Sequence, residues 1–146
     1  HYEIAHYQKK ISGPLLDRID LHVQVPPLQK EELLNSPVGE RSEQVRERVI
    51  KARKIQQERY QGLKTEANAG MTSREVRQFC PVNDAGEALL EKAIDRLGLS
   101  ARSYDRVLKV ARTIADLKGK HRIAADEIAE AIQYRSLDRA GYFINC

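Results

Sequence analysis

Two arginines in this sequence stand where a fixed positive charge could meet an anion. Arg18 lies between Asp17 and Asp20, just before a segment that alternates apolar and polar residues. Arg102 falls in the first turn of a helix expected at 100–118, where the helix dipole disfavours a cation unless an anion binds there. The simpler interpretation of each residue is a solvated surface arginine, and residue types alone favour that interpretation.

Short local elements would position Arg18. Ser12 or Gly13 can cap one helical turn that begins at Pro14, because proline suits the first helical position. Residues 20–25 then alternate as a strand with one buried face does, and the two prolines that follow cannot continue a strand. An arginine held just before a strand is well placed to reach an anion bound elsewhere.

From residue 42 onward, apolar spacing and capping residues predict a bundle of helices. The expected helices cover 42–60, about 73–80, about 84–97, 100–118 and about 124–134. Gly98 and Gly119 suit left-handed turns at helix ends, and Ser100 suits the cap of the helix that carries Arg102. A helical remnant is also expected at 3–10.

Three segments carry a resemblance to a known family. They are ISGPLLDRIDLHVQVP at 11–26, LSARSYDRVLKVARTIADL at 99–117 and IAEAIQYRSLDR at 128–139. Together they resemble AAA+ ATPases of the magnesium-chelatase and MCM-helicase lineage, most closely the magnesium chelatase-related proteins of the ComM/YifB type. The segments occur in that family's order, so the chain resembles the C-terminal part of such an ATPase.

The resemblance implies a mostly α fold. A helical-bundle AAA+ lid domain would follow a short remnant, one helix and one strand, of the αβα ATPase core. The implied division is a core remnant with the arginine-finger segment at 1–27, a linker at 28–41, the helical lid domain at 42–140 and a tail at 141–146. The helix at 42–60 is a candidate for the helix that this lineage inserts beside its lid.

The same resemblance assigns roles to the two arginines. Arg18 would be the arginine finger, acting in trans on the nucleotide of the next subunit, and Arg102 would be the sensor 2 arginine that reports nucleotide state. Arg106 lies one turn later, and Arg112 lies too deep in the helix to be the first choice. Whether Arg102 acts within its own subunit or across the interface stays open at this point.

Activity is expected only of a longer protein. An ATPase of this kind needs a G-x-x-x-x-G-K-[ST] loop, and the sequence contains none, so the loop and the Mg²⁺-binding acid are expected upstream of His1. The full-length protein is expected to be a cytoplasmic homo-oligomeric ring that uses ATP and Mg²⁺. The expected number of subunits is six. The isolated chain is expected to need no cofactor and to hydrolyse no ATP.

Composition restricts the remaining classes of function. No apolar run approaches the ~18 residues that span a bilayer, and no histidine has the spacing of a metal ligand. Cys80 and Cys146 are expected to be ordinary reduced thiols. The net charge of +4 permits DNA as a partner, although the basic helix at 42–60 is better explained as a solvated surface.

Three functions fit these observations. The first is the finger and lid region of a DNA-remodelling AAA+ motor of the ComM/YifB type. The second is the same region in the ATPase subunit of a true magnesium chelatase. The third is an independent helical DNA-binding or adaptor module.

Overall fold

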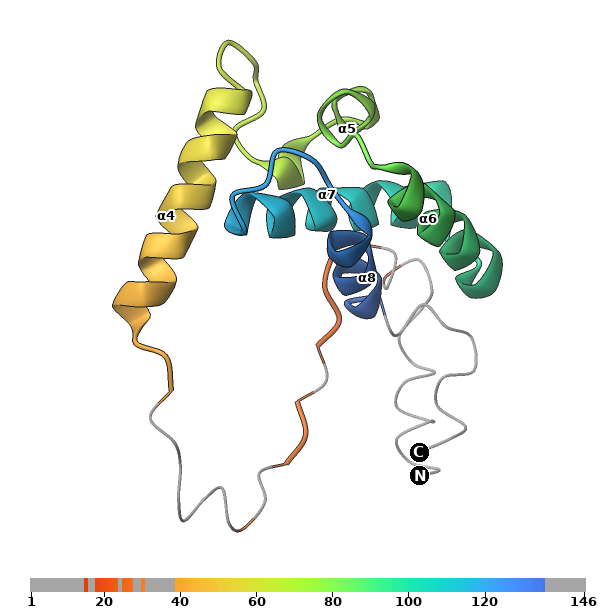
Figure 1. The fold of residues 1–146 in the computed structure, drawn as a ribbon, viewed down its shortest axis with the longest axis horizontal. Helices are drawn as coiled ribbons and strands as arrows, with labels where there is room; N and C mark the ends of the chain where they lie inside the picture. Colours follow the sequence, from red (N-terminus) through yellow and green to blue (C-terminus); the bar gives the residue numbers. More distant parts are fainter. Residues whose placement is uncertain (1–14, 16–17, 24, 28–29, 31–38, 136–146) are drawn as a thin grey trace.

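The helix α7 (Ala101–Leu117) runs through the middle of this computed structural model, and the other helices pack around it (Figure 1). The structure describes residues 15, 18–23, 25–27, 30 and 39–135. The remaining elements are α4 (Ser42–Arg59), the 3-10 helix η1 (Asn68–Gly70), α5 (Ser73–Phe79), α6 (Asp84–Leu97) and α8 (Ala125–Gln133). The predicted mostly helical fold is confirmed for the described residues.

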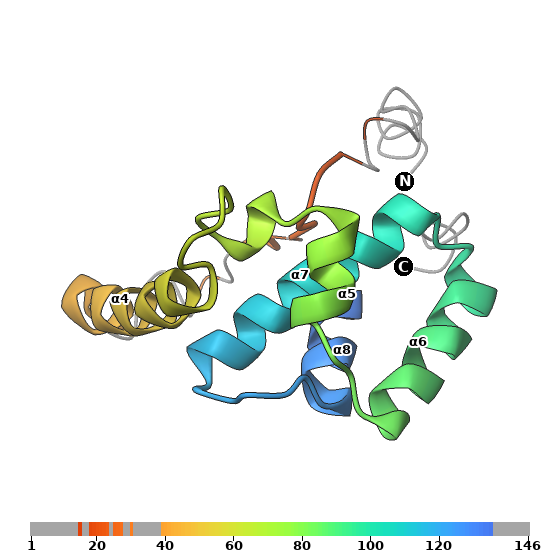
Figure 2. The ribbon, with the colours of Figure 1, turned by 90° about the horizontal axis from the view of Figure 1, so that it is seen from above.

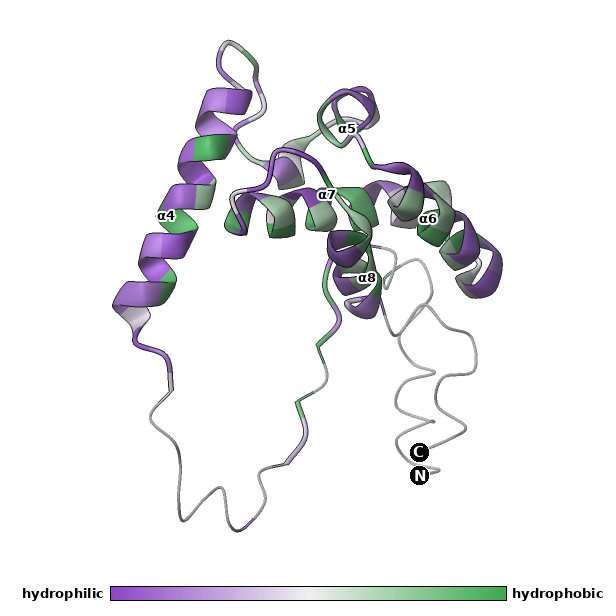
Figure 3. Cartoon of the chain, viewed as in Figure 1, coloured by the Kyte–Doolittle hydropathy of each residue, from purple (hydrophilic) through white to green (hydrophobic). Residues whose placement is uncertain are grey.

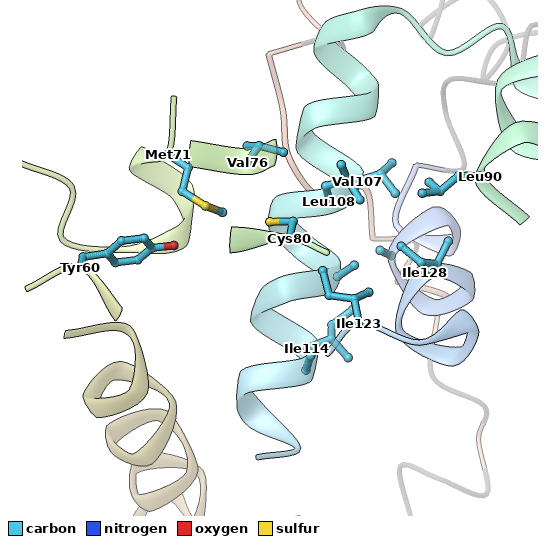
Figure 4. Close-up of a cluster of buried hydrophobic side chains, with 13 residues drawn as sticks. Tyr60, Met71, Val76, Cys80, Leu90, Val107, Leu108, Ile114, Ile123 and Ile128 are labelled. Atoms are coloured by element: carbon cyan, nitrogen blue, oxygen red, sulfur yellow. The ribbon is translucent and has the colours of Figure 1, made fainter. Parts of the chain in front are cut away.

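The core forms where α7 meets its neighbours. α7 contacts α8, α4, η1 and α5, whereas α6 packs against α8. Seen from above, α4 and α6 lie on opposite sides of α7 (Figure 2). The close-up in Figure 4 shows side chains from several helices converging there. The buried apolar set includes Met71, Val76, Leu90, Val107, Leu108, Ile114, Ile123 and Ile128.

Local capping explains where the helices begin and end. The Ser100 hydroxyl accepts a hydrogen bond from the Ser103 amide at 3.1 Å, so α7 begins where the sequence predicts. Asn83 caps α6 in the same way, accepting from the Gly86 amide at 2.9 Å. α6 ends at Gly98, whose φ of +62° is a left-handed conformation that glycine adopts without a steric penalty.

The helix α4 is only partly packed. Ala52 and Gln56, in its C-terminal half, are buried, and the helix is hydrophilic along most of its length (Figure 3). The 3.6-residue spacing in the sequence predicts one stripe of Val45, Val49, Ala52, Gln56 and Tyr60, yet Val45 and Val49 are 39% and 47% exposed. The predicted stripe is therefore correct for the C-terminal half of α4 and wrong for its N-terminal half, which no described element covers.

The predicted strand at 20–25 is not confirmed. Residues 20–23 and 25 are described, and none of them is assigned to a strand. Strand formation needs a neighbouring strand to supply hydrogen bonds, and the described residues include only an isolated bridge between Val82 and Ile123. The expected helix at 3–10, the tail at 141–146 and most of the linker at 28–41 lie outside the described residues.

Two further findings concern classes of site. Among the described residues, no helix is both long and apolar enough to cross a bilayer, and no group of three or more His, Cys, Asp or Glu side chains is placed to hold a metal ion.

Cys80 is buried, and this burial raises the pKa of its thiol to about 12. The thiolate form that reacts with oxidants and metals is therefore disfavoured at Cys80.

The core makes a first prediction. Ile128 is fully buried against α6 and α7, so Ile128→Ala should lower the free energy of unfolding by about 2–5 kcal/mol, through lost burial and a residual cavity. Ile50→Ala is the matched control, because Ile50 is also helical but 58% exposed, and it should change stability by less than about 0.5 kcal/mol. Urea titrations at neutral pH would measure both, and equal losses would contradict the described core.

Candidate functional site

The start of α7 presents Arg102 to solvent. The Ser100 hydroxyl and the Ser103 amide form the N-terminal cap of α7, whereas the Arg102 side chain in the same turn is exposed. No acidic residue lies in that turn, so the partial positive charge of the helix start is not offset by its own sequence. An arginine placed there adds to a local positive potential, which suits an anion.

A short segment lies against this end of the bundle. We call residues 18–23 the finger segment. The amide of His22 donates to the carbonyl of Tyr134 at 2.8 Å, and the Arg135 guanidinium donates to the carbonyl of Ile19. Arg106 forms an ion pair with Asp20. These contacts place the finger segment beside the first turns of α7.

The two predicted site residues line one cavity. The cavity has a volume of about 610 Å³, and Arg18 and Arg102 both contribute to its wall. The complete lining is Arg18, Asp20, Ala69, Ser73, Ala101, Arg102, Asp105, Arg106 and Lys109. We call this space the basic cavity, because four cationic side chains face two carboxylates in its wall.

The cations of the basic cavity differ in their partners. Arg106 is paired with Asp20, and Lys109 donates to the carbonyl of Ala69 at 3.1 Å. Within the described part of the chain, neither Arg18 nor Arg102 forms an ion pair, and both are exposed. These two guanidinium groups can therefore turn toward a ligand without breaking a described salt bridge. A guanidinium fork matches the oxygens of a phosphate.

Sequence reasoning missed part of this wall. Lys109 and Asp105 were not predicted as site residues, nor was Ser73, whose hydroxyl donates to Asp105 at 2.6 Å. One signal was available, because Arg102, Arg106 and Lys109 have the spacing i, i+4, i+7 of a single helix face. The contribution from α5 has no such local signal, since it depends on how α5 packs against α7.

A buried network fixes the other end of α7. Asp116 is 2% exposed and accepts hydrogen bonds from Arg59 at 2.5 and 2.7 Å, from Arg112 at 3.1 Å and from Asn68 at 2.8 Å. Arg112 also donates to the carbonyls of Lys120 and His121, at 2.5 and 2.8 Å. Arg112 thus has a structural role in joining α7 to the residues that follow it.

The buried network around Asp116 is connected to the wall of the basic cavity through η1. Asn68 begins η1, and the next residue, Ala69, forms part of the cavity wall and accepts from Lys109. Burial alone would raise the pKa of Asp116, but hydrogen bonds from Arg59 and Asn68 and the charge of Arg112 outweigh it, so the pKa lies below its ordinary value. Asp116 is therefore ionised at neutral pH and holds η1 against α7.

The network makes a second prediction. Asp116→Asn should lower the free energy of unfolding at pH 7 by about 3–5 kcal/mol, because two guanidinium groups lose their buried counter-charge. Asp95→Asn, at an exposed position of α6, is the matched control and should cost less than about 0.5 kcal/mol.

The same variant has a pH signature. The folded-state pKa of Asp116 is lowered, so its contribution is complete above the unfolded-state pKa of about 4 and is lost as the pH falls below it. The stability gap between wild type and Asp116→Asn should therefore narrow between pH 7 and about pH 2.5. A gap that stays constant in urea titrations across this range would contradict an ionised Asp116.

Comparison with known proteins gives two family matches and several relatives. The family described as magnesium chelatase, subunit ChlI C-terminal, matches residues 39–135, and the family described as magnesium chelatase, subunit ChlI, matches residues 1–33. Competence protein ComM of Haemophilus influenzae is 46% identical over 138 residues, which cover 94% of this chain and 26% of that protein. The uncharacterized protein YifB of Escherichia coli is 42% identical over 135 residues, which cover 91% of this chain and 26% of that protein. The chain thus spans about a quarter of the length of these relatives.

Proposed function

The chain belongs to the family of the magnesium chelatase subunit ChlI C-terminal region, and from this premise we propose that it supplies two phosphate-facing arginines to an ATP-hydrolysing AAA+ assembly. Arg18 is the arginine finger and Arg102 the sensor 2 arginine. The observation that carries the proposal is their position in the wall of one basic cavity, although they lie 84 positions apart in the sequence.

The chemistry follows from the charge of a transferring phosphoryl group. Negative charge spreads over the phosphate oxygens in the transition state, and a positioned arginine stabilises that charge. Such a finger supplied by a neighbouring subunit contributes roughly 10³–10⁵ in rate in known cases. Exposure of Arg18 and Arg102 supports this role, because neither guanidinium has to leave a described counter-ion to reach a phosphate.

The shared cavity also bears on which nucleotide each arginine meets. If Arg18 acts in trans, the position of Arg102 in the same cavity favours contact with the same phosphate chain. We therefore propose that both arginines of one chain act on the nucleotide held by the neighbouring subunit. The described residues hold no cluster fit for a metal ion, so we assign the ligands of the Mg²⁺ that accompanies ATP to none of them.

The whole protein is proposed to be a cytoplasmic homo-oligomeric ring, with six subunits as the expected number, that remodels DNA. The identities of 46% and 42% to ComM and YifB favour this type over a true magnesium chelatase. The chelatase ATPase subunit is the second candidate, because the matching family carries its description. Insertion of Mg²⁺ into a porphyrin by the purified full-length protein and its partners would favour that second candidate.

A third prediction concerns Arg18. In the full-length protein, Arg18→Ala should reduce the kcat of ATP hydrolysis by about 10³-fold or more while nucleotide affinity stays nearly unchanged, because the lost interaction belongs to the transition state. Arg122→Ala, which removes another exposed arginine outside the basic cavity, is the control and should leave turnover unchanged.

Subunit mixing tests action in trans. Arg18→Ala subunits mixed with subunits that lack a working phosphate-binding loop should regain part of the activity, since each supplies what the other lacks. A mixture that assembles into rings yet stays inactive would show that Arg18 does not act on a neighbour.

A fourth prediction separates sensing from stability at Arg102. Arg102→Ala should shift the melting temperature of this chain by no more than about 2–4 °C, because the side chain is exposed. Arg112→Ala is the matched control on the same helix and should destabilise strongly, because it leaves buried acceptors without a donor. In the full-length protein, Arg102→Ala should lower turnover more than Arg106→Ala does. The reverse order, or unfolding of Arg102→Ala, would end the sensor assignment.

A further inference from the structure

The finger segment is held on the bundle by contacts with Arg106, Tyr134 and Arg135. We propose that Arg106, Tyr134 and Arg135 form a clasp that fixes the finger segment to α7, and that the Asp20–Arg106 ion pair sets the separation of Arg18 and Arg102. Asp20 and Arg106 are then positioning residues. This inference rests on the proposed function, because it concerns how the two phosphate-facing arginines are brought together.

The register of the contacts carries the first step. Asp20 lies two residues after Arg18, and Arg106 lies one helical turn after Arg102 on the same face of α7. The Asp20–Arg106 ion pair therefore joins the finger segment to α7 close to Arg18 on one side and close to Arg102 on the other. A constraint at this place limits how far the two guanidinium groups can separate.

Two backbone contacts support the ion pair. Arg135 is fully buried, and its guanidinium donates both to the carbonyl of Ile19 and, at 3.4 Å, to the hydroxyl of Ser103 in the first turn of α7. It thus joins the finger segment to the helix start through one rigid group. The His22 amide donates to Tyr134 at 2.8 Å, which fixes the direction of the chain after Asp20.

The side chain of Arg106 is itself constrained. It is 22% exposed, and its Nε atom is buried with no hydrogen-bond acceptor among the described residues. A buried N–H donor without an acceptor costs free energy. Hydrogen bonding by Nε therefore does not explain why the Arg106 side chain lies here. The contact that the structure does give it is Asp20, which supports a role in holding the finger segment.

Apolar burial contributes little to this attachment. Leu21 and Val23 of the finger segment are 49% and 68% exposed. Beside Leu21 lies a second cavity of about 310 Å³ whose wall includes Val110, Ile114 and Tyr134, so the segment does not fill the space next to α7. The side chain of His22 is the exception, at 6% exposed. The described attachment is therefore mainly polar, with one buried imidazole beside the hydrogen bonds and the ion pair.

The plain alternative is an incidental surface ion pair. The side chain of Asp20 is 51% exposed, and exposed pairs contribute only about 0–1 kcal/mol. A pair of that strength is nevertheless sufficient to shift a local equilibrium by about two- to fivefold. Function can depend on such a shift even though global stability does not, and this difference can be measured.

Charge exchange between the two positions tests the clasp. The variants are Asp20→Arg, Arg106→Glu and the double exchange, with Asp95→Arg on the exposed face of α6 as the charge-matched control. In the 146-residue chain, each single variant should speed hydrogen exchange at the His22 amide by about two- to fivefold, and the double exchange should restore protection. Melting temperatures would confirm that all four variants fold.

Turnover of the full-length protein gives the second measurement. Each single variant should lower the kcat of ATP hydrolysis by at least about the same two- to fivefold. The double exchange, which keeps the net charge of the basic cavity, should recover it. Asp95→Arg should change neither measurement.

The outcomes distinguish the clasp from the proposed function. Unchanged protection of the His22 amide in both single variants would overturn the clasp, whatever Arg18→Ala and Arg102→Ala do to turnover. Lost protection with unchanged turnover, in a protein that Arg18→Ala inactivates, would show that the clasp forms but positions nothing. Full turnover in Arg18→Ala and Arg102→Ala would overturn the proposed function, and the positioning role would fall with it.

Discussion

The buried carboxylate of Asp116 is the interaction on which the arrangement of this bundle depends. It receives hydrogen bonds from α4, from η1 and from its own helix α7, so three elements meet at one ionised group. An ion in this position has lost its hydration, and only several donors together offset that cost. Loss of Asp116 itself would leave both Arg59 and Arg112 without this counter-charge, so the carboxylate makes the relative placement of α4, η1 and α7 specific.

One face of α7 packs into the core, and another face forms part of the candidate site. Val107, Leu108 and Ala111 point into the core, whereas Arg102, Arg106 and Lys109 line the basic cavity. The period of the α-helix allows both roles in one element, because residues three and four apart share a face. Packing on one face therefore fixes the direction of the cations on the other. The core thus sets the direction of Arg102, whereas the place of Arg18 depends on the contacts that hold the finger segment.

Local signals in the sequence were sufficient to predict the described α-helices, but not the contacts between them. The roles given to Arg18 and Arg102 came from the family resemblance and stay predictions. Caps such as Ser100 and Asn83 act within one turn, so they can be recognised without tertiary information. The apolar spacing in α6 predicts a face made of Ala88, Leu89, Ala93, Ile94 and Leu97. Ala93 is buried, but Ala88 and Ile94 are exposed, and the buried Leu90 lies outside the predicted face. The pairing of Arg59 with Asp116 joins residues 57 positions apart, and no local pattern encodes it.

The incomplete packing of α4 has a mechanical consequence. The helix has 18 residues and is about 27 Å long, and its attachment to the bundle lies near one end, at Gln56, Arg59 and Tyr60. A rigid rod fixed at one end acts as a lever. A rotation of about 10° at the attachment would carry the free end through about 5 Å, a distance comparable to one helical turn. Any tilt of α4 at its attachment would therefore move the exposed N-terminal end of the helix much farther than the residues that hold it.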